Sequence, residues 1–321
     1  MTGRGVSRRT VLRGGLGLAA AGLVGGCATD GYQGPPRTVV IAAGERGGFY
    51  LEFAQILADA VTAAEPALHC TAMATAGSQS NLDLLAAGHV DLALALADTA
   101  TAAAGGSPPL DLRALGRVYE NYTQLVVLAD SAVRAVPDLA GRTVSLGAAG
   151  SGAALSGDRI LAAAGMTAPH AARITHLPLA DAVSALEHRA IDALLWSGGV
   201  PTPALAALDA RSGIRLIPLD SVVPSLRATY GTVYEQVSIP ADAYRQGREV
   251  PTVGIANLLV AMPNLPDAVA SAVVDVLVRD ASRLVPPQAL GAQFLDVRTL
   301  IVTAGLPLHP GAAAAYRNLH G

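Results

Sequence analysis

The sequence predicts an α/β fold in which two similar lobes enclose a ligand cleft. In the segment 38–98, three apolar runs alternate with two helix-like segments, each preceded by a glycine turn. The same order recurs over 143–196. Strands that alternate with helices indicate a parallel sheet, and ligands collect where such glycine turns lead into helices. Two long extended segments are available to join the units. A single long sheet is the alternative, and the repeat favours two lobes.

Composition limits the class of protein. A chain of 321 residues is long enough for two lobes of ordinary size. It is 51% hydrophobic and 15% charged with a net charge of −3, which indicates a well-buried globular protein and gives no electrostatic basis for nucleic-acid binding. The 22 basic residues are all arginine. The lack of lysine excludes Schiff-base and phosphate-loop chemistry.

The first 27 residues have the features of an export signal. Residues 7–13, S-R-R-T-V-L-R, form a twin-arginine pattern, and the apolar stretch 16–26 is too short to span a bilayer comfortably. This stretch ends in L-V-G-G-C, which resembles a bacterial lipoprotein box with Cys27 as the acylated first residue of the mature chain. We therefore expect a protein exported by the twin-arginine route and anchored by lipid outside the cytoplasm. A cleaved secretory signal with an incidental cysteine is the alternative.

Residues 28–37 are polar and contain glycine and proline, as in a short tether. The first unit follows. Strands are expected at 39–43, 68–74 and 90–96, and helices after Gly48 and after Gly77. The exposed N–H groups at such helix starts favour an anion. Cys70 lies in the second strand and has no cysteine partner, which indicates a buried thiol.

The second unit repeats this order. Its strands are expected at 143–146, 173–177 and 191–196, with helices at 153–164 and from 181. In both units the second strand follows the first by about 30 residues. Asp91 and Asp192 each follow a helix and begin the third strand, within L-A-A-G-H-V-D-L-A-L and L-E-H-R-A-I-D-A-L-L. We interpret both as markers of a strand start and not as an acid–base pair.

The remaining segments join the lobes. Extended segments are expected at 112–128, 214–219, 237–240 and 253–261, and helices at 266–284 and 312–319. The chain would cross to the second lobe near residue 125 and return near 252. The predicted organisation is a signal peptide (1–27), a tether (28–37), a first lobe (38–125 with 253–321) and a second lobe (126–252).

Seven short motifs occur in the same order as in one family. They are R-G-G-F-Y (46–50), A-G-S-Q-S-N-L-D-L-L-A-A-G-H-V-D-L-A (76–93), L-A-D-T-A (96–100), Y-E-N-Y-T-Q-L-V-V (119–127), D-L-A-G-R-T-V-S-L-G-A-A-G-S-G (138–152), I-D-A-L-L-W-S-G-G-V-P (191–201) and I-P-A-D-A-Y (239–244). Together they resemble the TAXI branch of the solute-binding proteins of tripartite ATP-independent periplasmic (TRAP) transporters.

This resemblance implies a type II periplasmic-binding-protein fold, with two α/β lobes joined by hinge strands around a ligand cleft. It implies a monomer, without catalytic activity or cofactor, that captures a small organic anion or amino acid. The ligand, of the dicarboxylate or amino acid class, would be delivered to membrane permease subunits driven by an ion gradient. Presentation of the bound form to a membrane sensor kinase is the alternative role.

The predicted ligand site combines helix-start amides, hydroxyls and aromatic walls. Its residues are Gly47, Gly48, Tyr50, Gly77, Ser78, Asn81, Glu120, Gln124, Gly150, Ser151, Gly152, Trp196, Gly199 and Pro201, with Phe49 or Tyr50 as an apolar wall and Tyr119 beside Glu120. For each glycine a tight turn is the alternative role, and for each serine or asparagine a helix cap.

Three positions depart from the family pattern. Arg46 replaces a residue that is usually small, Ala153 stands where threonine is frequent, and Ala97 precedes Asp98 where a polar residue is common. Arg46 is either a partner of a ligand carboxylate or an exposed residue at the rim, and the rim is favoured.

No enzyme motif stands out. Neither Ser151 nor Ser156 lies in a G-x-S-x-G elbow, and the seven histidines lack the spacing of a metal site. We therefore predict neither catalysis nor a resident metal.

Overall fold

Three parallel strands and the helices between them form the first unit as predicted. The strands are β1 (Arg37–Ala42), β2 (Leu68–Met73) and β3 (Leu92–Leu96), and the helices are α1 (Phe49–Ala64), α2 (Ser78–Ala86) and α3 (Ala97–Ala104). Strand β1 pairs with β2 on one edge and with β3 on the other. The computed structural model describes residues 31–168, 171–286, 295 and 298–320, and the residues from Tyr32 onward form one compact unit. The predicted signal peptide and Cys27 lie outside the described residues.

The second unit has the same arrangement. Its strands are β5 (Thr143–Ser145), β6 (Arg173–Thr175) and β7 (Ala193–Gly198), and its helices are α4 (Gly152–Ala163) and α5 (Leu179–Glu187). Strand β5 pairs in parallel with β6 and with β7, as β1 does with its own neighbours. Two helices that the sequence did not predict follow β7: α6 (Pro203–Ser212) and α7 (Val223–Tyr230). Strands β8 (Ile214–Ile217) and β9 (Tyr234–Ile239) complete this part.

The two aspartates that begin the third strands have equivalent contacts. The Asp91 carboxylate accepts hydrogen bonds from the Val40 amide at 2.9 Å and from the Arg37 guanidinium at 2.6 Å. The Asp192 carboxylate accepts from the Thr143 amide at 2.8 Å and from Arg142 at 3.4 Å. Each aspartate thus ties the start of its strand to the first strand of its unit. This agrees with the interpretation of both residues as markers of a strand start.

Two long strands serve both halves of the molecule. Residues 113–122 of β4 (Arg113–Leu128) pair with β10 (Val250–Ala261), while residues 122–128 pair with β7 and β8. The C-terminal part of β10 pairs with β3 and its N-terminal part with β9. In the described residues the strands therefore form one ten-stranded sheet. Eight of them follow the order β2-β1-β3-β10-β4-β7-β5-β6, and the other two, β8 and β9, pair with β4 and β10. The two halves are joined by shared strands and are not separate sheets, although the lobe boundaries near residues 125 and 253 stay a prediction.

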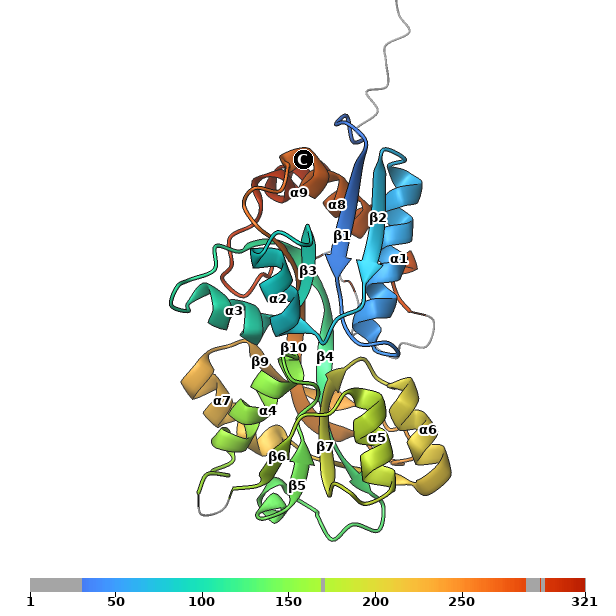
Figure 1. The fold of residues 1–321 in the computed structure, drawn as a ribbon, viewed down its shortest axis with the longest axis vertical. Helices are drawn as coiled ribbons and strands as arrows, with labels where there is room; N and C mark the ends of the chain where they lie inside the picture. The colour runs from blue at the N-terminus through green and yellow to red at the C-terminus, as the bar shows by residue number, and fades with distance from the viewer. Residues whose placement is uncertain (1–30, 169–170, 287–294, 296–297, 321) are drawn as a thin grey trace, which may run out of the picture. The chain divides into compact units, whose positions relative to one another are not determined.

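Helices cover both faces of this sheet (Figure 1). Helices α1, α8 (Asp267–Arg279) and α9 (Pro310–His320) share one apolar cluster with β1 and β3. Helices α2, α3, α4 and α7 share a second cluster that includes residues of both halves, and α5 and α6 pack with β7 in a third. Three short 3-10 turns lie at Val136–Leu139, Asp220–Val222 and Ala281–Arg283. None of the helices in the described part of the chain combines the length and apolarity that a membrane crossing requires.

A buried polar cluster ties α3 to α4. The fully buried Asp98 accepts hydrogen bonds from the Ser156 hydroxyl at 2.7 Å and from the Tyr234 hydroxyl at 2.8 Å. The Arg159 guanidinium lies 4.0 Å from the same carboxylate oxygen and donates to the Tyr234 hydroxyl at 3.0 Å. Burial raises the pKa of Asp98, and these hydrogen bonds and the positive charge oppose the rise. The cluster thus connects an element of the first unit to elements that follow the crossover.

We predict that Asp98→Ala lowers the free energy of unfolding by about 2–4 kcal/mol, because it removes the acceptor of three buried hydroxyls, those of Thr99, Ser156 and Tyr234, and the negative charge beside Arg159. Asp111→Ala is the matched control, since the Asp111 side chain is 64% exposed and pairs only with its neighbour Arg113. That variant is expected to lose no more than about 1 kcal/mol. Urea unfolding followed by circular dichroism measures both values, and equal losses in the two variants would contradict the assigned role.

Candidate functional site

A small cavity lies where the two units face each other. It has a volume of about 40 Å³, and its walls come from the turn after β1, the starts of α1, α2 and α4, and the end of β7. Ligand pockets commonly have volumes of about 300–1,000 Å³. The space between the described lining residues is therefore suited to a compact ligand.

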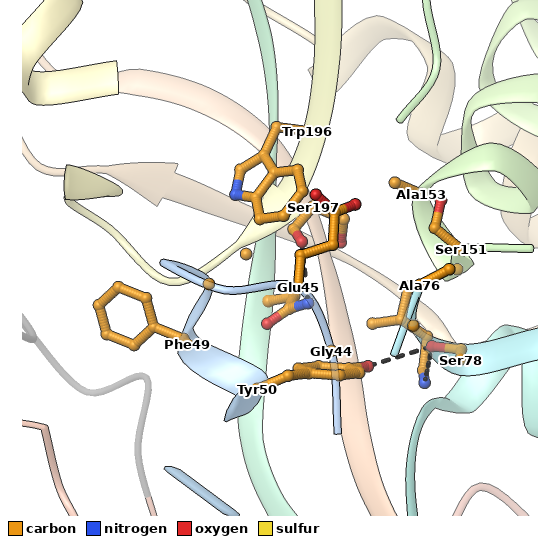
Figure 2. A pocket seen from close by; sticks show the side chains of 16 residues that line it. Gly44, Glu45, Phe49, Tyr50, Ala76, Ser78, Ser151, Ala153, Trp196 and Ser197 are labelled. Atoms are coloured by element: carbon orange, nitrogen blue, oxygen red, sulfur yellow. Dashed lines mark hydrogen bonds between the residues drawn. The ribbon is translucent and has the colours of Figure 1, made fainter. Parts of the chain in front are cut away.

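Half of the predicted site residues line this cavity. They are Gly48, Tyr50, Gly77, Ser78, Ser151, Gly152 and Trp196. Phe49, which was expected to form an apolar wall, also lines it. Figure 2 shows that Tyr50 and Ser78 lie on one side of the cavity and that Trp196 lies on another.

Three helix N-termini meet at the cavity. Helix α1 has Gly48 at its N-cap, α2 has Gly77 and α4 has Ser151. The first amides of a helix have no partner within it, and the helix dipole adds partial positive charge at this end. Three such ends around one space favour a negatively charged group, such as a carboxylate.

The starts of α2 and α4 are in van der Waals contact across the two units. A Cβ atom built on Gly77 would lie 3.4 Å from the Ser151 Cα, and one built on Gly152 would lie 2.6 Å from the Ser78 Oγ. Glycine at position 152 thus allows the starts of α2 and α4 to lie closer together than they would with a side chain at this position. At Gly77 the φ angle is +120°, which is also a conformation that favours glycine.

The serines at these helix starts also have structural partners. Ser78 Oγ accepts a hydrogen bond from the Leu96 amide at 3.0 Å and lies 3.2 Å from the Tyr50 hydroxyl. Ser151 Oγ accepts from the Ala154 amide, which makes it a conventional N-cap. Burial raises the pKa of Tyr50, opposed by its hydrogen bond to Ser78, so its hydroxyl stays protonated. The cap role that the sequence left open is therefore present for Ser151.

Several lining residues were not predicted from the sequence. They are Gly44, Glu45, Ala76, Leu96, Asn121, Ala153, Ser197 and Gly198. Asn121 lies on β4, donates a hydrogen bond to the Ser197 carbonyl at 3.2 Å and accepts one from Asn257 at 2.9 Å, so it joins β7, β4 and β10. Most of these residues adjoin predicted positions in the turns. Extending each predicted segment by one or two residues would have found them.

Glu45 is the most consequential of the unpredicted residues. It follows β1, yet one of its carboxylate oxygens, Oε2, accepts a hydrogen bond from the Leu179 amide at the start of α5, at 2.7 Å. Burial raises the pKa of Glu45, the Leu179 amide opposes the rise, and the charge of Asp181 adds to it. The cavity therefore has an acidic side chain beside its three helix starts.

The other seven predicted site residues lie outside the cavity. They are Gly47, Asn81, Glu120, Gln124, Gly150, Gly199 and Pro201. Asn81 is fully buried behind the cavity, where its amide donates to the carbonyls of Ala43 and Leu94 and accepts from the Thr75 hydroxyl. It therefore ties together the ends of β1 and β3.

Gln124 also has buried protein partners. Its amide nitrogen lies 3.2 Å from the Thr202 hydroxyl and 3.4 Å from the Gly199 carbonyl, and its oxygen accepts from the Tyr244 hydroxyl at 2.5 Å. Gly199 permits close packing, since a Cβ atom there would lie 2.5 Å from the Phe49 ring. Pro201 follows a cis peptide bond.

The remaining residues outside the cavity lie in turns and at the strand β4. Gly47 is exposed with a φ angle of +80°, and the Gly150 carbonyl accepts from the Ser80 amide at 3.1 Å. Arg46 is exposed and does not line the cavity, as expected for a rim residue. The Glu120 carboxylate lies 3.7 Å from Arg117, and burial raises its pKa to about 7.

A model of the NMT1-like family matches residues 41–319. The chain belongs to the NMT1-like family. The match runs from the end of β1 into α9 and includes all residues of the cavity.

This NMT1-like chain shares its fold with several solved proteins. The alkanesulfonate-binding protein SsuA of Xanthomonas axonopodis pv. citri, bound to MOPS, is 19% identical with a TM-score of 0.51, and the match covers 89% of this chain and 84% of SsuA. A protein of Bordetella bronchiseptica RB50 is 16% identical with a TM-score of 0.53, covering 88% and 98%. A Listeria monocytogenes protein assigned to an L-cystine ABC transporter is 13% identical with a TM-score of 0.51, covering 81% and 98%. The predicted fold of the periplasmic-binding-protein kind is confirmed.

We predict that Gly152→Ala prevents full approach of the two units, because its Cβ atom would lie 2.6 Å from both Ser78 Oγ and Leu96 Cδ1. Overpacking of this kind costs about 1–3 kcal/mol. Small-angle X-ray scattering should show a larger radius of gyration than in the unmodified protein. The control is Gly105→Ala, whose Cβ atom would have its nearest neighbour at 3.4 Å. An unchanged radius for Gly152→Ala would contradict the prediction.

A second prediction concerns the pH dependence of stability. The pKa of Glu120 is about 7 in the folded protein against an ordinary value of 4.5, so the folded state binds this proton more tightly than the unfolded state. The contribution of Glu120 is therefore present below pH 4.5 and is lost as the pH rises toward 7. Glu120→Gln should lose less stability between pH 4.5 and pH 8 than the unmodified protein, measured by urea unfolding. The exposed Glu249→Gln should leave the pH profile unchanged, and a profile equally steep in Glu120→Gln would refute the assignment.

Proposed function

We propose that this chain is an extracytoplasmic solute-binding protein that captures a small carboxylate-bearing molecule between its two halves. One observation carries the proposal: the N-termini of α1, α2 and α4, which belong to both repeated units, converge on a single cavity. This arrangement stabilises a carboxylate without any cationic side chain. The fold that the chain shares with the alkanesulfonate-binding protein SsuA supports the same function.

Ligand capture is proposed to stabilise the closed arrangement. A carboxylate that accepts hydrogen bonds from the starts of both α2 and α4 binds the closed form better than a form in which these helices are apart. That difference in affinity drives closure. Strands β4 and β10, which serve both halves, are the elements about which the halves would move.

The partner is proposed from the resemblance of the sequence motifs to TAXI proteins. It is a TRAP permease in the membrane, driven by an ion gradient. The name of one protein with a similar fold refers to alkanesulfonate binding, and that of another to an ABC transporter. At 19% and 13% identity, respectively, these names do not decide the ligand or partner of this chain. The twin-arginine pattern supports export, and Cys27 supports a lipid anchor. We propose that the anchored protein is a monomer.

The test is a thermal-shift screen of the purified protein against acetate, lactate, dicarboxylates and L-amino acids, followed by isothermal titration calorimetry. At least one carboxylate is expected to raise the melting temperature, because a ligand that binds only the folded form stabilises it. Uncharged amides of the same acids serve as controls and should have no effect. Failure of every carboxylate in the screen would contradict the proposed function.

A further inference from the structure

Glu45 adds a negatively charged side chain to the cavity. Among the described residues that line the cavity, it has the one charged side chain, and none of the others is arginine or histidine. The cavity therefore combines three partially positive helix starts with one carboxylate. Figure 2 shows the Glu45 side chain extending toward Trp196 and Ser197, on the side of the cavity away from Tyr50 and Ser78.

The two oxygens of the Glu45 carboxylate have different surroundings. Oε2 accepts the hydrogen bond from the Leu179 amide, which holds the side chain across the two units. Oε1 is buried and has no hydrogen-bond partner in the described structure. Buried carboxylate oxygens are normally paired, and an unpaired one has a substantial cost in free energy. A hydrogen-bond donor in the cavity would satisfy it.

A second unpaired acceptor lies on the same wall. Ser197 is 8% exposed, lines the cavity, and its hydroxyl has no hydrogen-bond partner in the described part of the chain. Its backbone carbonyl already accepts from Asn121, which fixes this end of β7. One side of the cavity thus offers oxygen acceptors, while the starts of α2 and α4 on the other side offer amide donors.

We propose that the ligand is a zwitterion, an amino acid whose carboxylate binds at the starts of α2 and α4 and whose ammonium group donates a hydrogen bond to Glu45 Oε1. This inference rests on the proposed function and narrows its ligand class. An ammonium group has three donors, one for Glu45 and another for the Ser197 hydroxyl. A dicarboxylate would instead place a further negative charge beside Glu45, with no cationic side chain in the cavity to offset it.

A bound metal ion is a poorer match for the same atoms. Calcium takes six to eight oxygen ligands, and magnesium requires a nearly octahedral set. Glu45 is the one carboxylate at the cavity, and no group of three metal-binding side chains occurs in the described residues.

Matched pairs of ligands test the inference. L-alanine with propionate, L-aspartate with succinate, and L-glutamate with glutarate differ only in the ammonium group. Isothermal titration calorimetry of the purified protein should show binding of at least one amino acid. Its partner without the ammonium group should bind at least about 10-fold more weakly, since hydrogen bonds to charged groups are among the strongest in proteins.

The variant Glu45→Gln isolates the contact with Oε1. Glutamine keeps the size of the side chain, and its carbonyl oxygen can still accept from the Leu179 amide, so the contact between the units is retained. Affinity for the amino acid should fall at least about 10-fold. Glu249→Gln, at an exposed position, should leave it unchanged. Circular dichroism of Glu45→Gln checks that the variant is folded, and Glu45→Asp, which keeps the charge, should retain more affinity than Glu45→Gln.

The outcomes separate this inference from the proposed function. If succinate binds as tightly as L-aspartate, or glutarate as tightly as L-glutamate, the ligand need not be a zwitterion and this inference is overturned. The proposed capture of a carboxylate would still stand. Unchanged amino acid affinity in Glu45→Gln would likewise overturn this inference. If no carboxylate of either kind binds, the proposed function fails and this inference fails with it.

Discussion

The approach of two helix N-termini is the constraint on which the site depends. Helices α2 and α4 start in different units, and their first residues, Ser78 and Gly152, are so close that a Cβ atom at position 152 would displace the Ser78 hydroxyl or the Leu96 side chain. Both ends carry partial positive charge, so their proximity is unfavourable unless something compensates. A carboxylate between them would do so. The contact between α2 and α4 therefore places two partially positive helix ends at the wall of the cavity.

Buried polar contacts hold the surrounding elements in this arrangement. Asp98 connects α3 to α4 and to Tyr234, while Asn121 and Asn257 connect β7, β4 and β10. Glu45 adds a contact between the turn after β1 and the start of α5. Such contacts need defined geometry, because a buried group that loses its partner is costly. Together with the apolar cluster that includes residues of both halves, they fix the arrangement of the elements around the cavity.

The predicted site residues divide according to where they lie in their elements. At the glycine turns, the residues directly at the helix starts, such as Gly77 and Ser151, line the cavity, while Gly47 and Gly150 just before them lie outside it. Glu120 and Gln124 do not line it either, although Asn121 between them does. Successive side chains of a strand point to opposite faces. Glu120 and Gln124 are one and three residues from Asn121 on β4, so their side chains lie on the face opposite to that of Asn121. A motif located the strand correctly but did not show which of its faces lines the cavity.

The sequence by itself determined the repeated order of strands, glycine turns and helices, because apolar periodicity and glycine placement are local properties. It thereby determined that helix starts gather at one edge of the sheet. The tertiary structure decided how the two units meet. Three features join residues that are far apart in the chain. The halves share β4 and β10, Glu45 accepts a hydrogen bond from the Leu179 amide, and Asn81 is buried behind the cavity. No local pattern encodes such pairings, since they depend on which faces come together when the chain closes.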